Sequence, residues 1–115
     1  MIGDRDADAL EDILYSIDLL KKYSAGLSEE KFYKNQEKQD LIVHRLEIIG
    51  EASSRISDEI KDKYDDIPWE DMINMRNILI HQYDNIFLDI VWKTLKEKIP
   101  EVEEEILGIK EEEDF

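Results

Sequence analysis

The stretch "IPWEDMINMRNILIHQY" (residues 67–83) determines how the chain must fold, because it predicts a helix with apolar residues on nearly all sides. Pro68 suits the first turn of a helix, and Glu70 and Asp71 suit its positive end. We expect this helix to run to about His81 or Tyr83. Such an apolar helix must be covered on more than one side. The rest of the chain can cover one side, and the other invites a partner, most simply a second copy.

Arg76 has an unusual place on this predicted helix. At about 100° per residue, several large side chains fall within about 60° of it: Trp69, Met72, Ile73, Ile80 and Tyr83. A cation on such a stripe is costly unless it is paired or faces a polar cleft. Asn77 and His81 lie on the polar flank, four residues apart, so the amide could orient the imidazole.

The remaining segments also carry helical spacing. Residues 6–23 predict an amphipathic helix, which Gly26 ends, and Ser28 is a candidate N-cap for a short helical turn near Phe32. A second long helix is expected over 37–57, and a fourth follows the apolar positions from Leu88 to Ile99. Pro100 is expected to restart a last short helix. The fold class is therefore all-α, an up-and-down bundle of four to five main helices in one domain (1–115), with residues 110–115 as a frayed acidic tail.

Composition restricts the partners. The 115 residues include 30 acidic and 15 basic ones, for a net charge of −15, and no cysteine. This charge argues against nonspecific binding to nucleic acid, so phosphate chemistry needs a small local site or a partner. No apolar run reaches the roughly 20 residues that cross a bilayer, and "MIGDRDADALEDIL" lacks the order of a signal peptide. We expect a cytoplasmic protein that does not contact the membrane.

The polar side chains of the 67–83 stretch have two interpretations. Taken singly, Arg76 is a structural cation paired with Glu51, and His81 is a satisfied polar residue. Taken together, Arg76, Asn77, His81 and Tyr83 surround a short apolar run, and functional sites are where local rules are expected to break. The grouping favours a site.

"RNILIHQY" (76–83) resembles the R-x4-H-x-Y motif of the HepT-like branch of the HEPN ribonucleases. Three further segments are similar to that family: "HRLEIIGEASSRIS" (44–57), "IPWEDMINMRN" (67–77) and "DIVWKTLKEKIPEVEEEI" (89–106). Together they cover roughly residues 8–107. One departure is Phe87, where an acidic residue is expected at a helix start.

The resemblance implies a homodimeric HEPN-like toxin of a type II- or type VII-like toxin–antitoxin pair, which cuts RNA without metal or cofactor. The implied antitoxin is an MNT-type nucleotidyltransferase that transfers AMP to the motif tyrosine, here Tyr83. In metal-free cleavage the 2′-OH attacks phosphorus and leaves a 2′,3′-cyclic phosphate. His81 suits the proton transfers because its ordinary pKa is about 6.5, and Arg76 suits the phosphorane charge. Asn77 would support the ring or a phosphate oxygen, and Tyr83 a base or a phosphate.

Other features are weaker signals. His44 is interpreted as a surface or packing residue, Gly50 as a point of close helix approach, and Lys31, Lys34 and Lys38 as either a basic stripe for RNA or solubilising charges. No spacing suggests a metal site. An alternative function remains open: a noncatalytic helical partner that docks and positions a nucleotidyltransferase. The net charge of −15 favours this alternative slightly, and the set of Arg76, His81 and Tyr83 favours the ribonuclease more.

Overall fold

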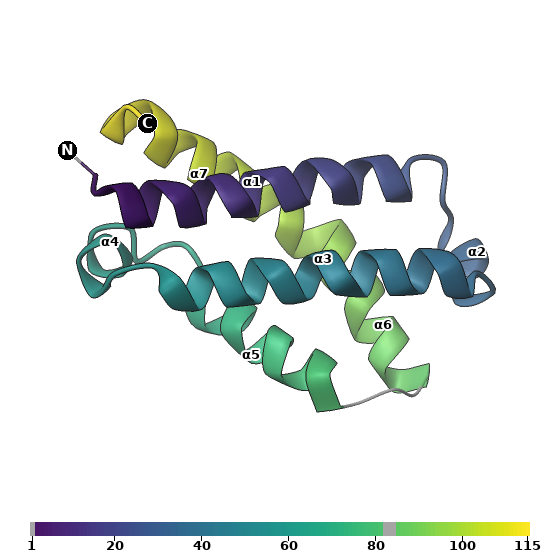
Figure 1. Ribbon diagram of the computed structural model, residues 1–115. Helices are drawn as coiled ribbons and strands as arrows, with labels where there is room; N and C mark the ends of the chain where they lie inside the picture. The colour runs from purple at the N-terminus through teal and green to yellow at the C-terminus, as the bar shows by residue number, and fades with distance from the viewer. Residues whose placement is uncertain (1, 82–84) are drawn as a thin grey trace.

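The computed structural model describes residues 2–81 and 85–115, and in these ranges it is all α-helical. Helix α1 (Asp4–Ser24) and helix α3 (Gln36–Arg55) lie side by side and antiparallel, joined through the short α2 (Glu29–Tyr33) (Figure 1). Helix α4 (Asp58–Lys63) leads into α5 (Trp69–His81), which packs on α3. Helix α6 (Asn85–Lys93), the π-helix η1 (Thr94–Lys98) and α7 (Ile99–Glu113) then run diagonally behind α1 and α3 in this view. The predicted all-α bundle is confirmed.

The core forms where the helical stripes predicted from sequence meet. The apolar positions of α1 (Leu10, Ile13, Ile17 and Leu20) are fully buried against those of α3 (Ile42, Leu46 and Ile49). Side chains three and four residues apart share one face of a helix, so each stripe offers a continuous surface to its neighbour. Phe32 of α2 is also fully buried, with its ring centroid 5.3 Å from that of Trp92 on α6.

The breaks between helices follow local chemistry. Gly26 has φ of 71°, a left-handed conformation that favours glycine, and it ends α1 as expected. The Ser28 hydroxyl accepts a hydrogen bond from the Lys31 N–H at 3.1 Å, which confirms the predicted N-cap. The helix expected over 37–57 ends at Arg55, because Ser57 caps the separate helix α4. Asp6 of α1 accepts hydrogen bonds from both the N–H and the hydroxyl of Ser57, which holds this break against α1.

The helix near Pro100 differs from the prediction. Pro100 does not restart a separate helix, because α6, η1 and α7 follow one another without a break. The Ile99 N–H bonds the Thr94 carbonyl, five residues earlier, which is the π-helical pattern. Buried positions recur every four residues from Phe87 to Ile99, which in an α-helix would rotate by about 40° per step. The wider π turn offsets this drift just before the proline, whose ring would clash with a carbonyl in a regular α-helix.

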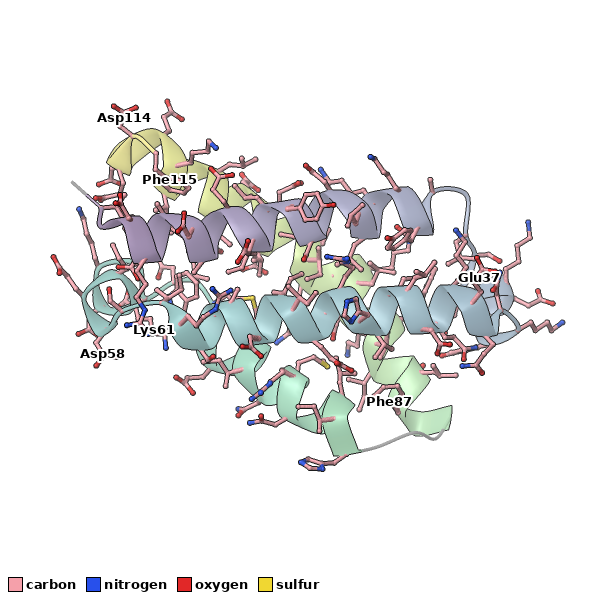
Figure 2. All side chains as sticks on the ribbon, viewed as in Figure 1. Glu37, Asp58, Lys61, Phe87, Asp114 and Phe115 are labelled. Carbon is pink, nitrogen blue, oxygen red and sulfur yellow. The ribbon has the colours of Figure 1, made fainter. Side chains whose placement is uncertain are left out.

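The acidic end of the chain is also more ordered than the frayed tail expected at 110–115. Helix α7 extends to Glu113, whose carboxylate accepts hydrogen bonds from Lys63 Nζ at 2.6 Å and from the Tyr64 hydroxyl at 2.5 Å. These bonds lower the pKa of the Glu113 carboxyl. Phe115 packs against the core (Figure 2). A long-range contact to α4, which local charge could not reveal, orders this segment.

None of the helices in the described ranges is long and apolar enough to span a membrane.

Candidate functional site

The candidate site is built on the contact between α3 and α5, which is very close at Gly50. A Cβ placed on Gly50 would lie 2.3 Å from Cβ of Arg76 and 2.7 Å from the Met72 carbonyl oxygen. Because no side chain fits there, glycine permits the two helix backbones to approach, as its position in the sequence predicted. Ser53, one turn further along α3, is also buried, and its hydroxyl lies 3.8 Å from Sδ of Met72. Sequence reasoning missed Ser53, because only the contact reveals that a small residue is needed there.

Arg76 lies at the edge of this contact. The buried residues of α5 are Trp69, Met72 and Leu79, whereas Ile73 is only half-buried and Ile80 is 40% exposed. The predicted stripe centred on Arg76 is therefore wrong in detail, because close packing at Gly50 turns α5 toward Met72 and Leu79. The base of the Arg76 side chain is covered by α3, and its guanidinium reaches outward, so that 35% of the side chain is exposed.

In the part of the chain that the structure describes, two side chains contact the Arg76 guanidinium. Glu51, next to Gly50 on α3, has its Oε2 3.8 Å from Nη2 of Arg76, and the Glu51 side chain is 59% exposed. The Asn77 Oδ1 accepts a long hydrogen bond of 3.4 Å from Nη1 of Arg76. Both contacts are longer than the 2.7–2.9 Å that is usual for charge-assisted hydrogen bonds. Among the described residues, the guanidinium is thus held only loosely.

His81 and Asn77 are both exposed on the outer side of α5, where His81 is the last residue of the helix. Within the described ranges, the amide of Asn77 is bonded to Arg76 and not to His81, so the expected orienting contact is not formed. Tyr83 lies outside the described residues. The structure therefore brings Arg76, Asn77 and Glu51 together and leaves the His81 imidazole facing solvent.

Helix geometry separates the two residues expected to carry chemistry. Arg76 and His81 are five residues apart in α5, which corresponds to a rise of about 7.5 Å and a rotation of about 140°. One copy of α5 therefore presents the guanidinium and the imidazole in different directions. The arrangement offers a permanently charged cation and a solvent-facing acid–base group, both of which suit an anionic substrate.

The remaining candidates do not join this group. His44 is exposed on α3, and Lys31 is exposed on α2. Lys34 pairs with Glu30 at 3.2 Å, and Nζ of Lys38 lies 5.9 Å from the ring centre of Tyr23. These contacts fit the solubilising role better than a continuous basic stripe.

Phe87 departs from the family motif, and possible metal-binding side chains are a separate point. Phe87, which replaces the acidic residue expected at the start of α6, is buried and belongs to the core (Figure 2). Its contribution is therefore to packing. In residues 2–81 and 85–115, His, Asp and Glu side chains form no group of three that could hold a metal ion.

Comparison with known proteins gives consistent results. The family described as "Ribonuclease HepT-like" matches residues 13–109. A Methanocaldococcus jannaschii protein, "Gamma-glutamylcyclotransferase and putative RNase MJ0434", is 41% identical over 90% of this chain, which spans only 46% of that protein. "Putative RNase MJ1380" of the same organism is 36% identical over 89% of this chain and 94% of its own length. "Probable ribonuclease HepT" of Thermococcus cleftensis is 40% identical over 81% of this chain and 84% of its own length.

No solved structure matches this chain. The family match covers the helices that hold Gly50, Arg76 and His81, and the sequence relatives extend over most of the same region. This chain belongs to the HepT-like ribonuclease family.

Proposed function

We propose that the protein is a metal-independent endoribonuclease toxin that acts in the cytoplasm on RNA, with Arg76 and His81 as its catalytic residues. The observation that carries the proposal is the loosely held Arg76 guanidinium, 35% exposed, on the same short helix as the exposed His81. A structural arginine would be expected to have close, saturating partners, whereas the contacts here are 3.4 and 3.8 Å long.

The chemistry needs one proton acceptor, one proton donor and a cation. The 2′-OH loses its proton to an imidazole and attacks phosphorus. The bond to the 5′-oxygen breaks, that oxygen takes a proton, and the products are a 2′,3′-cyclic phosphate and a 5′-hydroxyl. Arg76 balances the additional charge of the phosphorane, and His81 suits both proton transfers because an imidazole nitrogen can accept a proton and give it up again. Asn77, in contact with Arg76, supports the guanidinium.

We propose that the complete site forms between two copies of the chain. Because Arg76 and His81 point about 140° apart on α5, one copy closes poorly around a single phosphate. Two copies of α5 facing across a two-fold axis would supply two arginines and two histidines to one cleft. Ile80, on the Arg76 side of α5, is 40% exposed, and Ile78, nearer to His81, is 36% exposed; each supplies apolar surface for contacts with another copy.

We also propose a nucleotidyltransferase antitoxin of the MNT type, which neutralises the toxin by attaching AMP to Tyr83. The attached phosphodiester would add negative charge and bulk where RNA phosphate must bind, and it could occupy Arg76. No rearrangement of the fold is needed for this inhibition. The alternative of a noncatalytic docking partner uses the same helix as a binding and modification surface, and the net charge of −15 favours it.

The test is RNA cleavage by the purified protein in EDTA. The wild-type protein should cut single-stranded RNA and leave 2′,3′-cyclic phosphate ends. His81→Ala should abolish cleavage while leaving the circular dichroism spectrum and the Tm unchanged, since His81 is exposed. Arg76→Ala should also abolish cleavage, and its loose ion pair with Glu51 predicts a loss of stability of no more than about 1 kcal/mol. Cleavage by His81→Ala at the wild-type rate would exclude the catalytic role.

A further inference from the structure

The carboxylate of Glu51 lies beside the partly exposed guanidinium of Arg76. Glu51 follows Gly50 on α3, so the close backbone approach at Gly50 also sets the distance between the two charged side chains. The distance from Oε2 of Glu51 to Nη2 of Arg76 is 3.8 Å, and both side chains are partly exposed. In the described part of the chain, Arg76 is the one cation within ion-pair distance of Glu51.

This ion pair is poorly suited to holding the fold together. Exposed ion pairs contribute little to stability, because water already solvates both charges and salt screens them. The buried contacts of Met72 and Leu79, together with the close approach at Gly50, already fix α5 on α3. A charged pair that is loose and accessible can instead be exchanged for another ion at low cost.

We propose that Glu51 is a specificity-determining residue that competes with the RNA phosphate for Arg76. This inference rests on the proposed function of Arg76. A phosphodiester carries one negative charge, like a carboxylate, and can accept two hydrogen bonds from a guanidinium. Phosphate must therefore compete with Glu51 for the Arg76 guanidinium. Replacing the Glu51 carboxylate by a phosphate gains little binding free energy by itself, so a ligand that offers only a phosphate binds Arg76 weakly. RNA makes further contacts in the cleft, and these contacts favour its phosphate over Glu51.

The experiment measures binding of a fluorescent single-stranded RNA to the full-length protein in a His81→Ala background, which prevents cleavage. Glu51→Gln keeps the side-chain size and removes the charge. It should tighten RNA binding by about two- to fivefold at low salt, the range expected for an exposed ion pair. The slope of log K against the logarithm of the salt concentration should become more negative by up to about 0.7, because one more cation becomes fully available to phosphate. In an Arg76→Ala background, Glu51→Gln should have no effect on binding.

Glu37→Gln is the matched control. Glu37 is exposed in the first turn of the same helix, 14 residues from Glu51 or about 21 Å along the axis, and Figure 2 labels it beside α2. It changes the net charge equally and should leave RNA affinity unchanged.

Three results would overturn the inference: equal or weaker binding by Glu51→Gln, equal tightening by Glu37→Gln, or a Glu51→Gln effect that persists without Arg76. If binding depends on Arg76 but not on Glu51, only the competition fails. If Arg76→Ala leaves RNA binding unchanged, the proposed site fails and the competition fails with it.

Discussion

Replacing Gly50 with alanine should destabilise the protein, although alanine is the better helix former. The new Cβ would lie 2.3 Å from Cβ of Arg76 and 2.7 Å from the Met72 carbonyl oxygen, against about 3.5–4 Å for an ordinary carbon contact. Helix α5 must therefore move away from α3 by about 1 Å. A gap of that size removes about a quarter to a half of the van der Waals energy of each contact between the two helices. Overpacking costs about 1–3 kcal/mol, whereas the gain in helix propensity is about 1 kcal/mol.

The expected net loss for Gly50→Ala is therefore up to about 2 kcal/mol, which lowers the Tm by as much as roughly 10 °C in a domain of this size. Thermal unfolding followed by circular dichroism measures this shift. Gly108→Ala is the control, because Gly108 also lies inside a helix but has nothing within 4 Å of the added carbon. It should raise stability by about 1 kcal/mol. Equal stabilisation of both variants would refute the close approach of α3 and α5.

Three further predictions concern other parts of the molecule. Hydrogen bonds from Lys63 and Tyr64 lower the pKa of Glu113 in the folded protein. The stabilisation that these bonds give the fold is therefore complete above the ordinary carboxyl pKa, and it is lost as the pH falls through the lowered pKa of folded Glu113. Glu113→Gln should therefore lower the urea midpoint at pH 7 and converge with wild type as the pH falls below the ordinary carboxyl pKa, and a constant difference would contradict this cause. Ile78→Glu, which places a charge at an exposed apolar side chain of α5, should convert the proposed dimer to a monomer in light scattering. Tyr83→Phe should escape addition of AMP by the co-expressed nucleotidyltransferase, as intact-protein mass spectrometry would show, and AMP on another residue would contradict the assignment.

The sequence predicts the helices well because each has a strong local signal. The stripe of α1, the Gly26 stop and the Ser28 cap depend on neighbours three or four residues away, and all three are confirmed. The close approach at Gly50 is confirmed too. It was predictable because an isolated glycine inside a helix usually has a packing reason. Such features can be predicted from one chain because their causes lie in one short window.

The features that sequence reasoning missed have long-range or fine geometric causes. Glu113 is bonded to α4, 50 residues away, and this contact orders an end that looked like a solvated charge run. The rotation of α5 toward Leu79 depends on where α3 touches it, so the exposure of Ile80 could not be inferred from a helical wheel. The amide of Asn77 is expected from the sequence to support the His81 ring or a phosphate oxygen, and only the structure shows that it bonds Arg76.

The π turn at η1 has a consequence for how this protein can change in length. A π turn holds about one residue more than an α turn, so deleting one codon within residues 94–98 would convert it to a regular α turn. The faces of α6 and α7 would keep their alignment, and the core positions on either side, such as Val91 and Val102, would stay inside. The same deletion in the middle of α7 would rotate all later side chains by about 100° and expose Ile106 and Ile109 to water. The turn therefore marks a point where a one-residue deletion preserves the alignment of the buried faces, although the ring of Pro100 would then meet a carbonyl that the π turn now moves away.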